Sequence, residues 1–296
     1  MVNMYSSSVP DHRKGVIAVI VAALLWSTGG LFIKLISLNS FQLSFFRSVF
    51  AAVIIFAILR GKAVKTNGLA LLNSLFYAGV LIIFVLATKT TTAANAIFLQ
   101  YTAPIFVLFL EPVFLKTRFE KINIVTIVIC VLGMALFFMG DLQPGDMYGN
   151  FYALMSGVCL AFFFVGVRKN KPELKFSSIF YGNILIAVLC APSLIGMNPL
   201  GLGDLSMVAY LGLIQIGLAY IIFTYGIAKI PAIEASLLAM IEPVLNPIWV
   251  FLGYGEQPTI YSIAGGLIIV ITIVIRTVIA EKKNTGLIKD EIPLGS

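Results

Sequence analysis

The residues best suited to chemistry lie in an apolar segment near the end of the chain, where Glu242 directly precedes Pro243 and Pro247 follows one turn later. A carboxylate inside an apolar membrane segment costs about 3 kcal/mol by insertion scales, so one retained there marks a functional site. Each proline removes a backbone donor, which predicts a broken or kinked helix. On a helix, Glu234, Glu242 and Asn246 fall within about 120° of one another. We therefore expect this polar face to point into a cavity.

Two roles are open for Glu242. It can contact a substrate or a transported proton, or it can pair with a buried Arg or hydroxyl group and only fasten helices together. We favour the first role, because ionisable side chains in apolar segments usually mark substrate or proton pathways. Asn246 would then help to bind substrate, and Pro243 and Pro247 would act in gating.

A second apolar segment carries a comparable set of residues, with Gln100, Tyr101 and Pro104 in one half and Glu111 toward its end. Gln100 and Tyr101 are candidates for lining the same cavity, and interhelical hydrogen bonds of about 1 kcal/mol are the equal alternative. Glu111 is a candidate for proton coupling, but Lys116 nearby favours pairing with a basic residue. Pro104 is a further candidate for gating.

Aromatic residues form the third candidate set, because an aromatic pocket suits amphipathic substrates. Packing inside the protein or contact with lipid is the alternative for most of them, so we expect two or three of six to line a path. The six are Trp26, Tyr77, Phe84, Tyr220, Phe223 and Tyr225.

The sequence contains no pattern typical of catalysis, metal binding or nucleotide binding. The only histidine, His12, stands in a polar N-terminal stretch, and Cys130, Cys159 and Cys190 lie in separate apolar segments without the spacing of metal ligands. No Ser/His or Cys/His set appears within the apolar segments, and no glycine-rich loop could cradle a nucleotide phosphate. The sequence therefore predicts no enzyme, no metal and no other cofactor.

The elements that must position these residues follow from composition. Of 296 residues, 60% are hydrophobic and only 11% are charged, and the mean hydropathy is +1.02. Apolar runs of about 20 residues recur, each long enough to cross a membrane as a helix. We expect ten such helices, near residues 15–36, 42–60, 68–88, 93–115, 122–140, 148–168, 176–196, 206–228, 231–254 and 258–279.

The basic residues predict how these helices are oriented. If the N-terminus is cytoplasmic, 17 of the 20 Lys and Arg residues fall in the tails and cytoplasmic connections, as the positive-inside rule requires. The net charge of +7 therefore orients the chain in a membrane and does not indicate nucleic-acid binding. We expect cytoplasmic tails at 1–14 and 280–296, the latter without a fold of its own. Arg47 is expected to be structural and paired with Glu256, and Lys34 to reach the membrane surface.

An internal duplication divides the chain into residues 15–140 and 148–279. A shift of 139 residues places Pro104 on Pro243 and Phe84 on Phe223. Because each half contains five spans, the second half must enter the membrane in the opposite direction. Inverted repeats of this kind occur in secondary transporters, with substrate bound near the midplane where the halves meet.

The sequence resembles the EamA-type transporters of the drug/metabolite transporter superfamily over residues 15–279. The resemblance rests on Trp26-Ser27-Thr28-Gly29-Gly30 with Lys34, Phe45-Phe46-Arg47, Pro104 with Pro243, and Gly253-Tyr254-Gly255-Glu256 with Gly265. The first half departs from the last motif, with Thr117 and Thr126 in place of its Glu and Gly. The resemblance implies a ten-helix fold and export of amino acids, related metabolites or toxic compounds without ATP.

We therefore expect a multi-pass protein of a prokaryotic plasma membrane whose partners are the bilayer and a small-molecule substrate. The favoured function is secondary active export of small amphipathic metabolites such as amino acids, coupled to protons through Glu242 or Glu111. The alternative is proton-coupled efflux of organic cations or drugs. An intramembrane enzyme or a receptor is disfavoured, because the chain lacks both catalytic sets and large extramembrane segments.

Overall fold

The computed structural model describes residues 9–91, 93–118, 120–137, 139, 147–254 and 259–290, and every regular element among them is a helix. Some side chains within these helices lie outside the description, including those of Lys34, Asn246 and Pro247. The all-helical architecture agrees with the fold class predicted from hydropathy.

The first half of the chain contains five helical runs at the expected positions. Two of these runs are interrupted, one at Thr28 and one near Tyr101. The elements are α1 (Val9–Ser27), α2 (Gly29–Leu35), α3 (Ser40–Leu59), η1 (Lys62–Val64), α4 (Gly68–Thr90), α5 (Ala93–Gln100), α6 (Ala103–Leu115) and α7 (Lys121–Phe137).

The second half contains five further runs. Its elements are α8 (Met147–Lys169), η2 (Pro172–Leu174), α9 (Ser177–Cys190), η3 (Ala191–Leu194), α10 (Leu202–Tyr210), η4 (Leu211–Leu218), α11 (Ala219–Ile227), α12 (Ala232–Ala239), α13 (Ile241–Tyr254) and α14 (Ile260–Asp290). Elements η1, η2 and η3 are short 3₁₀-helices, and η4 is a π-helix between α10 and α11. Helix α14 continues well past residue 279 to Asp290, so the first part of the expected tail extends the last helix.

Seven helical stretches among the described residues are long and apolar enough to cross a membrane by length and composition. The other three expected spans differ for identifiable reasons. The first is broken at Thr28 and begins with the charged side chains of Asp11, Arg13 and Lys14, the fifth is short at Lys121–Leu136, and the ninth is broken at Met240.

Prolines explain the breaks in the fourth and ninth runs. Proline cannot donate the helical hydrogen bond to the carbonyl group four residues earlier, and its ring clashes with that carbonyl. Helix α5 ends at Gln100, four residues before Pro104, and α12 ends at Ala239, four residues before Pro243. The broken helix predicted around Glu242 is therefore confirmed, and its counterpart lies at the matching position of the first half.

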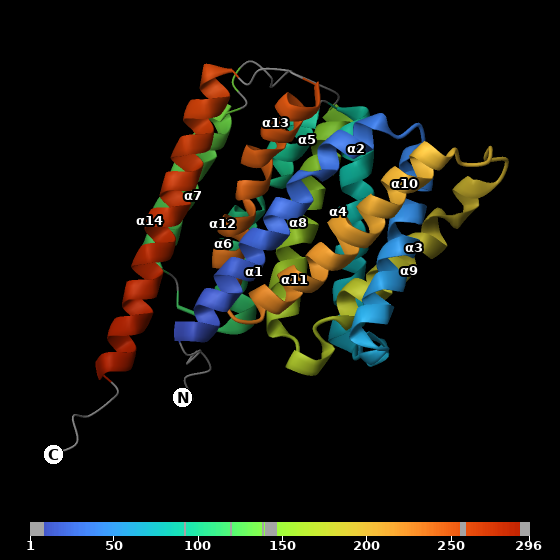
Figure 1. The fold of residues 1–296 in the computed structure, drawn as a ribbon. Coiled ribbons are helices and arrows are strands. Elements are labelled where there is room, and N and C mark those ends of the chain that lie inside the picture. Colours follow the sequence, from blue (N-terminus) through green and yellow to red (C-terminus); the bar gives the residue numbers. More distant parts are fainter. Residues whose placement is uncertain are drawn as a thin grey trace.

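Both ends of the described chain lie at one end of the helix bundle, which we call the termini end (Figure 1). The α3–α4 and α8–α9 connections meet at this end, where Asn67 Nδ2 donates to Asn170 Oδ1 at 3.1 Å. The α2–α3 and α9–α10 connections meet at the opposite end, which we call the far end, where Ser37 Oγ donates to Asp204 Oδ2 at 2.5 Å. Helix α1 thus starts at the termini end and α8 starts at the far end.

The helices of the two halves pack mainly against each other. Helix α4 lies against α8, and the corresponding helices with the halves exchanged, α11 and α1, also pack together. Likewise α5 and α6 pack on α8, while α12 and α13 pack on α1; α3 packs on α9, and α7 on α14. One buried core therefore spans both halves, and a cavity at its centre is walled by both.

Candidate substrate cavity

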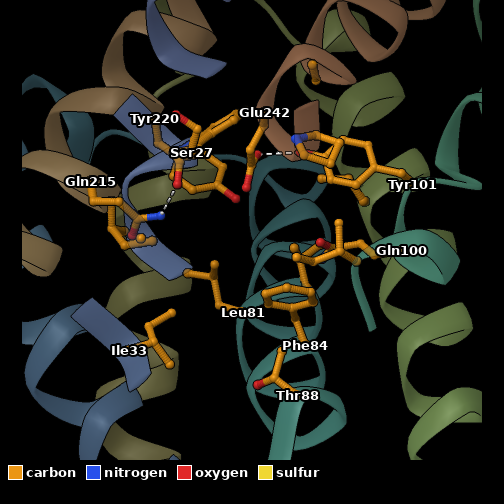
Figure 2. Close-up of a pocket in the computed structure, with 18 of the residues that line it drawn as sticks. Ser27, Ile33, Leu81, Phe84, Thr88, Gln100, Tyr101, Gln215, Tyr220 and Glu242 are labelled. Atoms are coloured by element: carbon orange, nitrogen blue, oxygen red, sulfur yellow. Dashed lines mark hydrogen bonds between the residues drawn. The ribbon is translucent and has the colours of Figure 1, made fainter. Parts of the chain in front are cut away.

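A cavity of about 410 Å³ lies where the two halves meet (Figure 2). Helices from both sides of the duplication form its walls, so its shape depends on how the halves pack. Its lining consists of Trp26, Ser27, Gly29, Ile33, Ile36, Arg47, Val80, Leu81, Phe84, Thr88, Lys89, Ile97, Gln100, Tyr101, Leu160, Phe164, Gln215, Ile216, Tyr220, Ala239, Glu242 and Pro243.

The carboxylate of Glu242 reaches this cavity from the first turn of α13. The hydroxyl group of Tyr101, in the turn between α5 and α6, donates a hydrogen bond to Glu242 Oε2 (Figure 2). The two residues stand at the two proline breaks, whose turns release the chain from helical geometry at this depth. This hydrogen bond joins the broken helices of the two halves across the cavity.

A guanidinium group lines the same cavity. Arg47 on α3 is 6% exposed, and its Nη2 donates to Gln215 Oε1 at 2.9 Å. Gln215 Nε2 in turn donates to the backbone oxygen of Trp26 at 3.2 Å. Glu242 and Lys89 line the cavity as well, so its wall holds two basic side chains and one acidic side chain.

Local backbone geometry places Gln215 here. The π-helix η4 inserts extra backbone into its helix, a feature often found at functional sites. Glycines allow the close approach: a Cβ atom on Gly29 would lie 2.5 Å from Gln215 Nε2, and one on Gly212 would lie 2.7 Å from the backbone oxygen of Arg47. Gly29 and Gly212 thus allow close helix packing, which also fixes the Arg47–Gln215 pair.

Aromatic rings form the apolar wall beside these charges. The rings of Trp26 and Tyr220 lie 4.7 Å apart between centroids, and Phe84 faces the cavity from α4 (Figure 2). The indole Nε1 of Trp26 is buried and has no hydrogen-bond partner among the described residues. The cavity therefore combines acidic and basic side chains with an apolar aromatic surface.

The cavity opens toward the far end of the bundle. Trp26 and Tyr101 at its inner part are each 6% exposed, whereas Lys89, near the end of α4, is exposed and donates to the backbone oxygen of Leu38 at 3.0 Å. Toward the termini end, aromatic residues fill the space. Tyr77 and Phe163 are fully buried with ring centroids 5.2 Å apart.

Polar contacts fasten the closed termini end. Glu111 on α6 accepts hydrogen bonds from the backbone nitrogens of Ala232, at 3.0 Å, and Ile233, at 2.8 Å, in the first turn of α12. His12 Nε2 lies 3.1 Å from Glu234 Oε2, and Arg276 Nη1 lies 2.8 Å from the same oxygen. Helices α1, α6, α12 and α14 are thereby joined on the side away from the cavity opening.

The structure gathers many of the sequence-predicted site residues in this cavity. Trp26, Phe84, Gln100, Tyr101, Tyr220, Glu242 and Pro243 all line it. Tyr77 and Phe223 are fully buried behind the wall, where each packs against an aromatic residue that lines it. Pro104 is buried at the start of α6 outside the lining, and the side chains of Asn246 and Pro247 lie outside the described residues.

Several expectations need correction. Glu234 does not face the cavity, because the break at Met240 interrupts the helical periodicity that placed it beside Glu242. Glu111 binds backbone amides, whereas the sequence favoured a basic partner. His12 is a buried residue of α1, although its surroundings in the sequence are polar. Tyr225 is 44% exposed and lies under Lys229.

Sequence reasoning missed several residues of the cavity, Arg47 and Gln215 among them. Arg47 was expected to be structural, yet it lines the cavity; its expected partner Glu256 lies outside the described residues. Gln215 was not singled out, although a lone amide in the apolar run from Leu211 to Phe223 is the kind of signal that marks an interhelical or substrate contact. Among the residues that the structure describes, no group of three His, Cys, Asp or Glu residues could hold a metal ion.

Comparisons with known proteins place this geometry in a family. The EamA-like transporter family matches residues 13–139 and again residues 147–278, so the family domain occurs twice. An uncharacterized transporter of Archaeoglobus fulgidus is 25% identical over 269 residues, which cover 89% of this chain and 96% of that protein. A pseudopaline exporter of Pseudomonas aeruginosa is 23% identical over 268 residues, 88% of this chain and 94% of that one.

A further relative and one solved structure are also similar to this chain. An uncharacterized transporter of Bacillus subtilis is 30% identical over 210 residues, covering 68% of this chain and 67% of that protein. One crystal structure shares the fold with a TM-score of 0.78 at 17% identity, covering 91% of this chain and 99% of that chain. The family consists of transporters and not of enzymes, and the duplicated match covers most of the helical bundle. The chain is therefore a multi-pass membrane transporter that belongs to the EamA-like transporter family.

Proposed function

We propose that the chain is a secondary active transporter that exports small amphipathic zwitterions, such as amino acids, by alternating access at the central cavity. The observation that carries the proposal is the presence of Arg47 and Glu242 in one aromatic-lined cavity. A guanidinium group binds a carboxylate, and a carboxylate binds an ammonium group, through charge-assisted hydrogen bonds. Trp26, Phe84 and Tyr220 offer apolar surface to the rest of the molecule.

The volume of the cavity is sufficient for one small ligand. Its volume of about 410 Å³ falls near the lower end of the range of about 300–1,000 Å³ for small-molecule sites. Gln100, Ser27 and Thr88 add polar groups along the wall, which can fix the orientation of a bound solute.

We further propose that residues 15–140 and 148–279 are inverted repeats that exchange conformations. The exchange of packing partners between the halves, such as α4 on α8 and α11 on α1, supports this symmetry. If the termini end faces the cytoplasm of a prokaryotic cell, the cavity described here opens to the outside. Rocking of the halves would then close the far end and open the termini end.

The direction of transport and its coupling are also proposed. The similarity to a pseudopaline exporter supports export. Glu242 is the better candidate for a coupling proton, since it reaches the cavity, whereas Glu111 is bound to the backbone amides of Ala232 and Ile233. Glu242, Pro243 and Pro104 lie at or beside the two helix breaks, where movement between states would occur.

Proton-coupled efflux of organic cations or drugs is the second candidate function. A carboxylate beside Trp26 and Tyr220 would attract a cation through both charge and aromatic faces. The positive charge of Arg47 opposes a substrate without a carboxylate, so the zwitterion is favoured.

The decisive experiment is counterflow in sealed liposomes containing the purified chain. Vesicles loaded with unlabelled amino acids should accumulate labelled amino acid, and Glu242→Gln should lower the rate about tenfold or more, as expected for loss of one charge-assisted hydrogen bond. Glu173→Gln is the matched control, because Glu173 is an exposed carboxylate on η2. An unchanged rate in Glu242→Gln would refute the proposed role, and exchange of organic cations without amino acids would favour the second function.

A further inference from the structure

We propose that a second cavity, between α7 and α14 at the termini end, binds the head group of an anionic phospholipid. This cavity measures about 330 Å³, and Arg118, Lys121 and Arg276 contribute to its wall. It lies apart from the central cavity and shares no lining residue with it. The proposed site is therefore independent of the identity of the transported solute.

The charge of the cavity favours an anion. Three cationic side chains and one carboxylate, that of Glu120, line it. Arg118 and Lys121 are exposed and can reach a ligand from the rim. Arg276 is 4% exposed and its Nη1 lies 2.8 Å from Glu234 Oε2, so the two rim cations carry most of the attraction for an anion. Basic pockets between membrane helices on the cytoplasmic side are suited to phosphate head groups.

The backbone adds to the positive electrostatic potential of this cavity. Helix α7 begins at Lys121, in the wall of the cavity, so the positive end of its dipole is directed at the site. Asn123 Oδ1 accepts hydrogen bonds at 3.2 Å from both Nε and Nη2 of Arg276, which holds the guanidinium between α7 and α14. The basic wall is thus anchored on both helices.

Apolar stripes continue from the cavity along both helices. On α7, Val125, Val128 and Leu132 are 57%, 52% and 65% exposed and follow Lys121 at helical spacing. On α14, Ile275 and Ile271 are 54% and 55% exposed and precede the lining residue Ile279 by one and two turns.

Because α7 and α14 pack side by side (Figure 1), the two stripes provide apolar surface on both helices leading away from the basic cavity. A free phosphate ion would use only the charges, whereas a phospholipid would use the charges for its head group and the stripes for its acyl chains. The geometry therefore favours a lipid over a soluble anion.

The test measures lipid binding to the full-length protein by native mass spectrometry in detergent, with phosphatidylglycerol as the probe. Phosphatidylcholine and inorganic phosphate serve as the zwitterionic and the soluble comparison. The double variant Arg118→Gln/Lys121→Gln removes the two rim charges. Since each basic residue near a membrane surface contributes about 1 kcal/mol to anionic-lipid binding, we expect the double variant to bind phosphatidylglycerol about thirtyfold more weakly.

The matched control is Lys62→Gln/Lys171→Gln, which removes the same charge from exposed positions at the same end but outside the cavity. This control should bind phosphatidylglycerol as the wild type does. Equal phosphatidylglycerol binding by the cavity variant and the control would overturn the proposal. So would equal binding of phosphatidylcholine by the wild type, or displacement of phosphatidylglycerol by millimolar inorganic phosphate.

Discussion

At the scale of single residues, the central cavity depends on side chains that hold one another in place. Tyr101 donates to Glu242, and Gln215 joins Arg47 to the backbone of Trp26. Each contact bridges the two halves of the chain. A substrate that replaced one of these bonds would therefore act on the packing between the halves, which is the movement that alternating access requires.

Two substitutions at Gln215 should distinguish its contribution to the stability of the fold from its contribution to substrate binding. Gln215→Leu leaves the buried guanidinium of Arg47 without its acceptor, which costs about 1–3 kcal/mol and should lower the melting temperature by several degrees. Gln215→Glu keeps an acceptor but neutralises the positive charge, so stability should persist while affinity for a carboxylate substrate falls about tenfold.

The measurements are thermal unfolding in detergent, with and without amino acids. A melting temperature for Gln215→Leu equal to that of the wild type would contradict the structural part of this prediction. Tighter binding of amino acids by Gln215→Glu would contradict the part that concerns charge.

Much of the site could be predicted because polar residues are conspicuous in apolar segments. Glu242, Gln100 and Tyr101 were found in this way, and the structure places all three at the cavity. The prediction for Glu234 is wrong because the helical period does not continue across the break at Met240. Arg47 was assigned a structural role because it lies near a helix end; only the packing of η4 on α3 reveals that it meets the cavity.

At the scale of elements, the closed termini end is held by a buried polar cluster that joins α1, α12 and α14 and includes the Glu234–Arg276 ion pair. His12, Glu234 and Arg276 are 3%, 1% and 4% exposed. Breaking a buried ion pair is costly because one charge remains without compensation, whereas removing both charges costs less. Helix α12 is thus held to α14 by an ion pair and to α1 by its contact with His12.

A double-mutant cycle should measure this pairing. Glu234→Gln and Arg276→Gln should each destabilise the protein by about 3–5 kcal/mol, and the double variant should cost less than the sum of the two. Thermal unfolding in detergent without added phospholipid reports the difference. Strictly additive effects would show that the two side chains do not interact.

Lys14→Gln is the control for this cycle. It removes a 4.0 Å contact between Lys14 and Asp11, whose side chains are 62% and 44% exposed. Such an exposed pair contributes less than about 1 kcal/mol, so the melting temperature should hardly change.

The breaks themselves were predictable where proline produced them and unpredictable elsewhere. Pro243 indicated the interruption at Met240 from sequence alone. The break at Thr28 has no proline near it; instead Ser27 and Thr28 bond back to the carbonyls of Leu24 and Leu25, each at 2.7 Å, which loosens the helical ladder. Such competition depends on rotamers that a sequence does not specify.

At the scale of the whole molecule, the ten expected helical segments and the division into halves followed from hydropathy and duplication. The way the two halves pack together could not be predicted from the sequence. Lipid and protein interior are equally apolar, so the apolar surface of a helix does not indicate which helix it packs against. The packing of α4 on α8 is set by close contacts, such as Gly79 against Cys159.

Cysteine labelling should test the proposed orientation. Ser206 is exposed at the far end and Thr66 is exposed at the termini end. In intact cells, a membrane-impermeant maleimide should modify Ser206→Cys and spare Thr66→Cys, and permeabilised cells should lose this difference. The unsubstituted chain is the control for Cys130, Cys159 and Cys190. Preferential labelling of Thr66→Cys in intact cells would reverse the orientation.

The aromatic layer below the cavity has an electrical consequence. Since the cavity opens to one side and buried rings close the other, most of the membrane voltage would drop across the barrier between Glu242 and the termini end. Moving one elementary charge through 100 mV requires about 2.3 kcal/mol. A cation leaving a cell with a negative interior would have to overcome this work at that barrier, whereas a zwitterion, which carries no net charge, would cross it without electrical cost.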